Sequence, residues 1–343
     1  MKRNTIITLS FIFALAGICS GFWFMYGANK VLMWTMYILS FCTPYGFTHI
    51  FEDFTLEWNG YSYPFNLINL YFYLSFFAGT LAYACSKGRE TRLLRFNYSV
   101  IILGHLIGLP FIIARFFFHE NNSGMKAPDF NPVMYFIQVL IFCLTFFIAY
   151  RVLVFFRKKS NLEISIEPDI DGKEQEYLLP ATKGQRFINY LVDDILISLY
   201  LITIIKNLVY NYTFSDSFHN TWLSALGNKF TLIVMVLMAR FVYFFIFEAL
   251  FASTPGKMLT QTRVSDKNGH KAGLESILRR TLSRFIPFET LTFLTGYNLH
   301  DKLSDTYVIR EEQKGVSSGI YLGIMLPVFL SIIIFHIIYN YIN

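Results

Sequence analysis

Long apolar stretches, separated by polar segments, dominate the chain. Seven of them reach the length that a transmembrane helix needs, about 20 residues. These are Thr5–Tyr26, Leu67–Ser86, Asn97–Phe117, Val133–Phe156, Ile188–Tyr210, Phe230–Ala252 and Ile320–Tyr341. An eighth apolar stretch, Val31–Phe51, is interrupted by the turn-forming sequence Thr43-Pro44-Tyr45-Gly46. The pattern predicts an all-α, polytopic membrane protein with about seven transmembrane helices and one interfacial or re-entrant segment.

The basic residues give this array an orientation. Lys and Arg concentrate in alternate loops: residues 87–95, the loop after Phe156 and the loop after Ala252. Because cytoplasmic loops are enriched in Lys and Arg, we predict that the N-terminus is inside and the C-terminus is outside. This alternation requires that residues 31–51 do not cross, which makes residues 29–66 an outer-side excursion. If residues 31–51 did cross, either the N-terminus or the basic loop at 87–95 would lie on the wrong side.

Composition agrees with the membrane class. The chain is 54% hydrophobic and 15% charged, whereas soluble domains carry about 25% charged residues. The net charge of +6 is explained by the cytoplasmic loops, so no nucleic-acid partner is predicted. The four cysteines lie in or beside apolar segments without the spacing of paired ligands. The sequence therefore predicts no disulfide framework, metal or cofactor.

The polar segments divide the chain into four parts. Residues 1–159 form a block of four spans, whose outer excursion contains the turn signal Trp58-Asn59-Gly60 and could include a small hairpin. Residues 160–180 read as an acidic cytoplasmic linker. Residues 181–309 form a second membrane domain, and residues 310–343 form a C-terminal transmembrane helix.

A few ionisable residues fall inside the predicted spans. Asp193 and Asp194 lie in the fifth span, and Arg240 and Glu248 lie in the sixth. A charge at the hydrocarbon centre costs at least about 2.5–3.5 kcal/mol, so such residues are usually paired or functional. We expect an Asp–Arg240 pair and consider the four residues a candidate ion or proton path. His105, in the third span, is either hydrogen-bonded within the bundle or part of such a path.

Two further features flank these spans. Arg186 lies seven residues before Asp193, so the two side chains share a helix face but are about 10 Å apart. Arg186 therefore needs a lipid phosphate or another loop, and Asp193 needs a neighbouring span. After the sixth span, Thr254-Pro255-Gly256-Lys257 ends the helix and turns the chain. Residues 261–265 and the turn at 266–269 predict a short cytoplasmic hairpin.

A cytoplasmic amphipathic helix is predicted next. Its apolar positions are Leu274, Ile277, Leu278, Leu282 and Phe285. Arg279, Arg280 and Arg284 lie on or beside the polar side, which suits a helix lying on the anionic lipids of the inner leaflet. The alternative is a helix packed on the bundle. His300, Asp301 and Asp305 follow and could ligate a metal, although their spacing is not diagnostic.

The order of these motifs resembles the RDD membrane family, named for one arginine and two aspartates. The resemblance covers about residues 178–309. It rests on Arg186 and Asp193, on a second span that bears Tyr and Glu, on Thr254-Pro255-Gly256-Lys257, on Arg279-Arg280 and on His300-Asp301 with Thr306. It implies that Arg186 is the family arginine, Asp193 the first aspartate and Asp301 the second, with Asp305 a competitor.

The resemblance implies a bacterial cytoplasmic (inner) membrane and no enzyme activity. Transport of ions or small ligands has been suggested for the family, so one hypothesis is a transporter or exchanger built on the intramembrane carboxylates. The alternative is a scaffold or accessory subunit, whose buried charges fix helix packing and whose basic helix docks lipid, a second copy or a membrane-protein partner. A metal-dependent enzyme at His300, Asp301 and Asp305 is a third. The sequence specifies neither the ligand nor the oligomeric state.

Overall fold

The computed structural model describes most of the chain. The described residues are 2–23, 54–58, 61–65, 67–118, 132–168, 174–206, 228–286, 299–312 and, near the C-terminus, 323–324, 327–332, 334 and 338. The chain divides into two compact units. The first comprises Met1–Leu153, Ile202–Lys206 and Gly319–Asn343, and the second comprises Val154–Leu201 and Asn207–Ser318. Each unit is described by itself.

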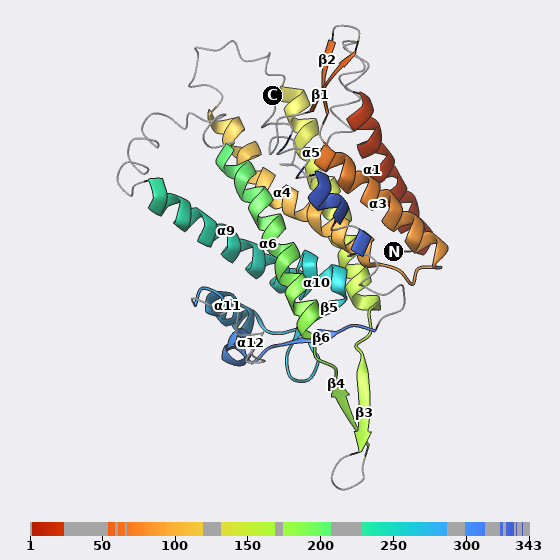
Figure 1. The fold of residues 1–343 in the computed structure, drawn as a ribbon, viewed down its shortest axis with the longest axis vertical. Coiled ribbons are helices and arrows are strands. Elements are labelled where there is room, and N and C mark those ends of the chain that lie inside the picture. The colour runs from red at the N-terminus through yellow and green to blue at the C-terminus, as the bar shows by residue number, and fades with distance from the viewer. Residues whose placement is uncertain are drawn as a thin grey trace. The chain divides into compact units, whose positions relative to one another are not determined.

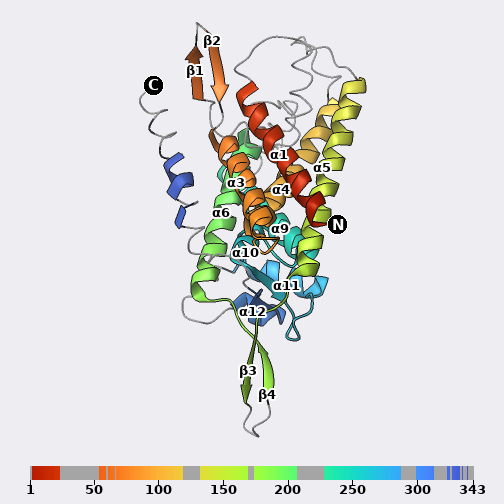
Figure 2. The ribbon, with the colours of Figure 1, turned by 90° about the vertical axis from the view of Figure 1, so that its right-hand side faces the viewer.

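The first unit is built from four long helices. They are α1 (Arg3–Trp23), α3 (Leu67–Cys85), α4 (Arg92–Phe118) and α5 (Pro132–Lys159). Helices α1 and α3 lie side by side (Figures 1 and 2). Gly17 permits this approach, because a Cβ there would come within 2.0 Å of the Tyr73 ring. Small residues of this kind let apolar helices pack closely.

Polar side chains connect these helices inside the unit. The Ser10 and Tyr98 hydroxyls are 2.8 Å apart and link α1 to α4. His105 of α4 is 1% exposed; its Nδ1 contacts the Ile101 carbonyl at 2.7 Å and its Nε2 contacts the Thr145 hydroxyl of α5 at 2.6 Å. The expectation that His105 is hydrogen-bonded within the bundle is confirmed. His105 and the ionisable residues of the fifth and sixth predicted spans belong to different units.

A hairpin follows α1 in sequence. Strands β1 (Phe54–Trp58) and β2 (Tyr61–Phe65) pair antiparallel, with Trp58 opposite Tyr61. The hairpin predicted from the Trp58-Asn59-Gly60 turn is therefore confirmed. The apolar stretch at 31–51 lies outside the described residues.

Short elements gather at one end of the long helices in the second unit. The long helices are α6 (Lys183–Lys206) and α9 (Asn228–Phe251). The short elements are α10 (Pro255–Thr260), β5 (Thr262–Ser265), α11 (Leu274–Ser283), α12 (Leu299–Ser304) and β6 (Tyr307–Arg310). They lie at the beginning of α6 and the end of α9 (Figure 1). A small apolar core fixes them there, formed by Ala249, Val264, Ala272 and Ile277 with Phe245 packed against it.

Strand β5 does not form the predicted local hairpin. The turn itself is present, because Asp266 Oδ1 accepts hydrogen bonds from the backbone N–H groups of Asn268 and His270 at 2.9 and 2.8 Å. Beyond the turn, however, the chain enters α11. The partner of β5 is β6, with Val264 opposite Val308. Both valines are buried, so the pairing that buries apolar surface replaces the local one.

The acidic segment at 160–180 is also more ordered than predicted. It forms an antiparallel hairpin of β3 (Ile164–Pro168) and β4 (Glu174–Leu178), which projects beyond β6 (Figure 1). Bridges from Leu162 to Glu311 and from Pro180 to Ile309 attach the segment to the end of β6. The all-α class therefore needs a correction: the described chain is mostly helical, with three two-stranded sheets.

Six of the seven predicted spans coincide with helices α1, α3, α4, α5, α6 and α9. The seventh, 320–341, is helical at its described positions. Among the residues that the structure describes, the helical segments Val139–Lys159 and Ile233–Phe251 are long and apolar enough to cross a membrane. On α5, Phe136, Leu140, Leu144 and Phe147 are exposed along one stripe, as expected of a surface that contacts lipid. Seven crossings and the N-inside orientation stay predictions.

Candidate functional site

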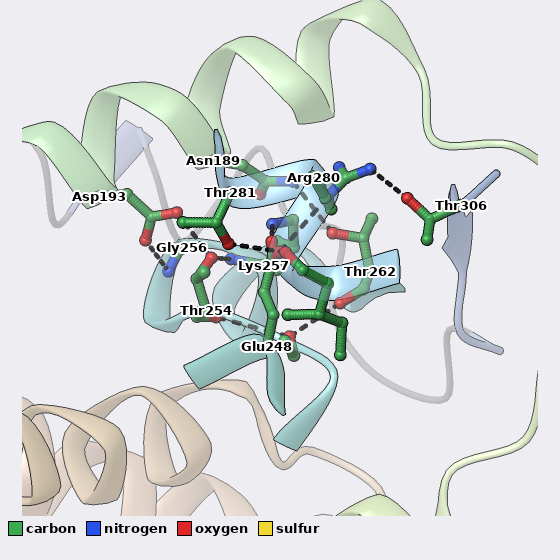
Figure 3. A network of polar contacts seen from close by, with 12 residues as sticks. Asn189, Asp193, Glu248, Thr254, Gly256, Lys257, Thr262, Arg280, Thr281 and Thr306 are labelled. Carbon is green, nitrogen blue, oxygen red and sulfur yellow. Dashed lines mark hydrogen bonds and ion pairs between the residues drawn. The ribbon is translucent and has the colours of Figure 1, made fainter. Parts of the chain in front are cut away.

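Asp193 joins three elements of the second unit. Its side chain is 2% exposed. Oδ1 accepts a hydrogen bond from the Tyr243 hydroxyl of α9 at 2.6 Å. It also accepts one from the Gly256 backbone N–H at 2.8 Å, and Oδ2 accepts one from the Thr254 hydroxyl at 2.6 Å (Figure 3). The expectation that Asp193 finds its partner on a neighbouring span is confirmed by Tyr243. The carboxylate also fixes the turn from α9 into α10.

The sequence Thr254-Pro255-Gly256-Lys257 is a helix start. Thr254 is the N-cap of α10, and its hydroxyl accepts a hydrogen bond from the Lys257 backbone N–H at 3.4 Å. Pro255 occupies the first helical turn, where a missing N–H costs nothing. At Gly256 the chain passes so close to α6 that a Cβ would lie 2.6 Å from the Asn189 carbonyl oxygen and 2.9 Å from Asp193 Oδ1. The motif is therefore a capped turn shaped to bind Asp193.

Gly256→Ala should destabilise the protein. The added methyl group would push α10 away from α6 and weaken the hydrogen bond to Asp193, at a cost of about 2 kcal/mol or more. The midpoint of thermal unfolding in detergent micelles measures the effect. Gly184→Ala is the matched control, because no atom lies within 4 Å of a Cβ at that α6 position. Equal midpoints for the two variants would contradict the close packing of α10 on α6.

Asn189 is a site residue that the sequence reasoning missed. It is 5% exposed; its Nδ2 donates to the Thr262 hydroxyl at 3.0 Å, and its Oδ1 accepts from the Thr260 hydroxyl at 2.5 Å. The signal was its spacing, three residues after Arg186 and four before Asp193, which places it on the face they share. Asn189 thus extends the contact of α6 with the end of α10.

Glu248 is fully buried beneath three cations. Lys257 Nζ and Arg284 Nη2 lie 2.5 and 2.7 Å from its Oε1, and Arg280 Nε lies 3.3 Å from its Oε2. Its side chain has 0% exposure. Because a buried carboxylate needs such partners, Glu248 is committed to this cluster.

Asp301 forms a second buried centre. Arg186 Nη1 lies 2.6 Å from its Oδ2, and Arg280 Nη1 bonds its Oδ1. Arg280 therefore bridges Glu248 and Asp301, and its Nη1 also donates to the Thr306 hydroxyl at 2.7 Å (Figure 3). Burial alone would raise the pKa of Asp301, but Arg280, His300 and Arg186 together hold that pKa well below its usual range. Arg186 thus finds its partner in another loop.

Asp305, the competitor for the second family aspartate, lies apart from this centre. It is exposed and adopts a left-handed backbone conformation with φ of 49°. His300 Nε2 lies 3.3 Å from Asp301 Oδ1. Both Asp301 oxygens already bind arginine, and no cluster of three or more His, Cys, Asp or Glu side chains suited to a metal occurs within the residues that the structure describes.

The prediction that Arg280 and Arg284 face lipid is wrong. Arg280 is fully buried, and the Arg284 side chain is 12% exposed. The buried carboxylates Glu248 and Asp301 attract the arginines inward, because in a low-dielectric interior they bind a cation more strongly than a hydrated lipid phosphate does. Arg279 does face outward and pairs with Glu275. The outer surface of α11 also carries exposed leucines, namely Leu274, Leu278 and Leu282.

The expected Asp–Arg240 pair forms with Asp194. Arg240 Nη2 lies 2.9 Å from Asp194 Oδ1, and the two side chains are 29% and 26% exposed. Arg240 also lies 6.0 Å from the centre of the Tyr190 ring. This pair is the most open part of a cluster whose other carboxylates are buried.

Lys257, in the short helix α10, has a strongly shifted pKa. Burial lowers the pKa of its ammonium group to about 8, and the nearby Arg284 and Arg280 act in the same direction, while Glu248 opposes them. Lys257 therefore loses its proton in a mildly alkaline medium rather than near pH 10.5.

A pocket lined by several charged residues opens between the elements of this cluster. Its lining includes five cations: Arg186, Arg240, Lys257, Arg280 and Arg284. Asp193 is its one lining carboxylate, and Tyr190, Phe244 and His300 also face it. The predicted path residues Asp193 and Arg240 thus line a common cavity, whereas Asp194 and Glu248 contribute through their bonds to lining cations.

Two apolar helices of the described chain are long enough to cross a membrane, and a buried charge cluster lies at the ends of two helices, an arrangement that suits a helical membrane protein. A model of the RDD family matches residues 180–342, a little under half of the chain. This segment is therefore similar to the RDD family, which is a membrane family. The match continues beyond the expected limit at residue 309 and includes the last apolar stretch. Comparisons with curated proteins and with solved structures each gave no significant match.

Proposed function

We propose that the protein moves a small ion or solute across the bacterial cytoplasmic membrane, and that the pocket in the second unit is its binding site. The observation that carries this proposal is the convergence of five cations and Asp193 on one cavity. Charged groups inside a membrane protein are energetically costly, and a binding cavity at helix ends is a common reason for their presence. The similarity of residues 180–342 to a membrane family supports the location in a membrane.

The contacts of the carboxylates favour a solute route through the pocket over an ion path along the buried carboxylates. Glu248 and Asp301 each hold two or more cations at short distance, so neither is free to exchange an ion. The Asp194–Arg240 pair is the exception, because both side chains are partly exposed. A solute entering the pocket can exchange with this pair at low cost, since partly exposed ion pairs contribute only about 0–1 kcal/mol.

Arg240→Gln is the variant that tests transport. The purified full-length protein is reconstituted into vesicles, and light scattering follows the entry of sodium chloride, potassium chloride, sodium phosphate and glycine. We expect at least one of them to enter faster than into protein-free vesicles, and we expect Arg240→Gln to slow that entry at least several-fold. Arg279→Gln is the matched control, because Arg279 lies outside the pocket lining and is 60% exposed. Entry at the rate of protein-free vesicles for all four solutes would remove the proposal.

A membrane scaffold is the second candidate, and the bridging of Arg280 between Glu248 and Asp301 favours it. In that role the charges fix helix packing, and the exposed leucines of α11 contact anionic inner-leaflet lipid, a second copy or a membrane-protein partner. A scaffold shows no solute entry in the vesicle assay, yet it copurifies in mild detergent with a partner at fixed stoichiometry.

A further inference from the structure

We propose that the pocket binds a small oxyanion, a carboxylate or phosphate group, through the guanidinium groups of Arg240 and Arg284. The inference rests on the proposed function, because it names the chemical class of solute that this pocket takes. It departs from a cation path, which the intramembrane carboxylates alone favour.

The first argument is the charge of the lining. Of the carboxylates in the cluster, only Asp193 lines the pocket. Asp194, Glu248 and Asp301 are not lining residues and are already paired with cations. Asp193 itself already accepts three hydrogen bonds, from Tyr243, Thr254 and Gly256. A solute in the pocket therefore meets guanidinium and ammonium groups, which bind oxyanions.

The second argument is that the Arg284 guanidinium is held in place but has a donor that is unpaired among the described residues. Its Nη2 donates to Glu248 Oε1 at 2.7 Å, and its guanidinium carbon lies 3.9 Å from the centre of the Phe244 ring. These two contacts hold the guanidinium in place before any ligand arrives. Its Nη1 is buried and has no hydrogen-bond partner among the described residues. A buried donor without an acceptor is costly, and an oxyanion that reaches Nη1 removes that cost.

Arg240 and Lys257 complete the site in different ways. Arg240 keeps Asp194 as a partly exposed partner, so it can share its guanidinium with a second acceptor. Lys257 supplies a proton-dependent charge, since the pKa of its ammonium group is about 8. The groups that act on it are Glu248 of α9, Arg280 of α11, Arg284 directly after α11, and Asp193 of α6. Oxyanion affinity should therefore fall when Lys257 loses its proton.

Sulfate is the probe that tests this site, because its charge stays constant across neutral and alkaline pH. The midpoint of thermal unfolding of the full-length protein in an uncharged detergent should rise with sodium sulfate, and not with sodium chloride at equal ionic strength. Arg284→Lys keeps the charge beside Glu248 but removes the second donor nitrogen, Nη1, so sulfate should bind roughly tenfold more weakly. Arg240→Gln should weaken binding similarly, and Arg279→Gln should not change it. Wild-type affinity should also decrease between about pH 7 and about pH 9.

Two sources could supply the oxyanion, a free solute or a lipid headgroup. Sulfate affinity is therefore compared in nanodiscs of phosphatidylcholine and of phosphatidylglycerol. Equal affinities identify a free anion, whereas a loss of sulfate binding in phosphatidylglycerol identifies a headgroup as the occupant. Both outcomes support an oxyanion site. No response to sulfate beyond that to chloride, or an unchanged affinity in both Arg284→Lys and Arg240→Gln, would overturn it.

The two proposals fail separately. Sulfate binding without entry of any solute into vesicles keeps the oxyanion site and removes transport. Entry of sodium or potassium without sulfate binding keeps transport and removes the oxyanion site.

Discussion

Asp301→Asn should destabilise the protein by about 3–5 kcal/mol. The variant leaves Arg186 and Arg280 facing each other across a neutral amide in a site where the Asp301 side chain is only 6% exposed. Removing one partner from a buried ion network leaves uncompensated charge, which costs about this much. Equilibrium unfolding of the full-length protein in mixed micelles measures it.

The control for Asp301 is Asp305→Asn, because Asp305 is exposed and asparagine tolerates its left-handed backbone. That variant should unfold like the wild type. Acid supplies a second check. Since the folded-state pKa of Asp301 is lowered, the stability it contributes is present above its unfolded pKa of about 4 and is lost as pH falls further. The difference in the free energy of unfolding between the wild type and Asp301→Asn should therefore decrease in acid. A difference that stays constant contradicts the role of the ionised carboxylate.

The long helices could be predicted from the sequence because their signal is local. A run of apolar residues of about 20 positions determines a helix without reference to the rest of the chain. A pair between Arg240 and one of the two adjacent aspartates could be predicted for a related reason, since a charge inside an apolar helix demands an opposite charge on the adjacent one. That the partner is Asp194 came from the structure. The helical spacing of Arg186 and Asp193 likewise predicted that each needs a partner from another element.

The interior of the cluster could not be predicted in the same way. Arg280 was expected on lipid because helical periodicity places it beside the polar side of α11, and periodicity does not reveal which side faces inward. That choice depends on Glu248 and Asp301, which are distant in sequence and buried against Arg280 only after the chain has folded. Strand β5 shows the same effect, because its partner is selected by burial of Val264 against the core rather than by the nearby turn.

Asp193→Asn should destabilise the protein by about 3 kcal/mol. The ionised carboxylate accepts hydrogen bonds from Tyr243, Thr254 and the Gly256 backbone N–H. An amide offers one oxygen and places an NH₂ group against a donor, so at least one charge-assisted hydrogen bond is lost, worth about 1.5–3 kcal/mol, and a buried donor is left unpaired. Because Thr254 caps α10 and the Gly256 N–H follows it, the start of α10 should loosen. Hydrogen exchange at the backbone amides of α10, together with equilibrium unfolding, measures both effects.

Asp194→Asn is the matched control, since it makes the same chemical change one residue along α6. Its carboxylate is 26% exposed and its partner Arg240 is 29% exposed, so water can replace the lost ion pair at a cost of at most about 1 kcal/mol. The two variants should therefore differ in stability, because Asp193 holds α6, α9 and α10 together whereas Asp194 is partly exposed. Two results would show that Asp193 does not connect these helices: equal destabilisation by Asp194→Asn and Asp193→Asn, or unchanged protection of the α10 amides from hydrogen exchange in Asp193→Asn.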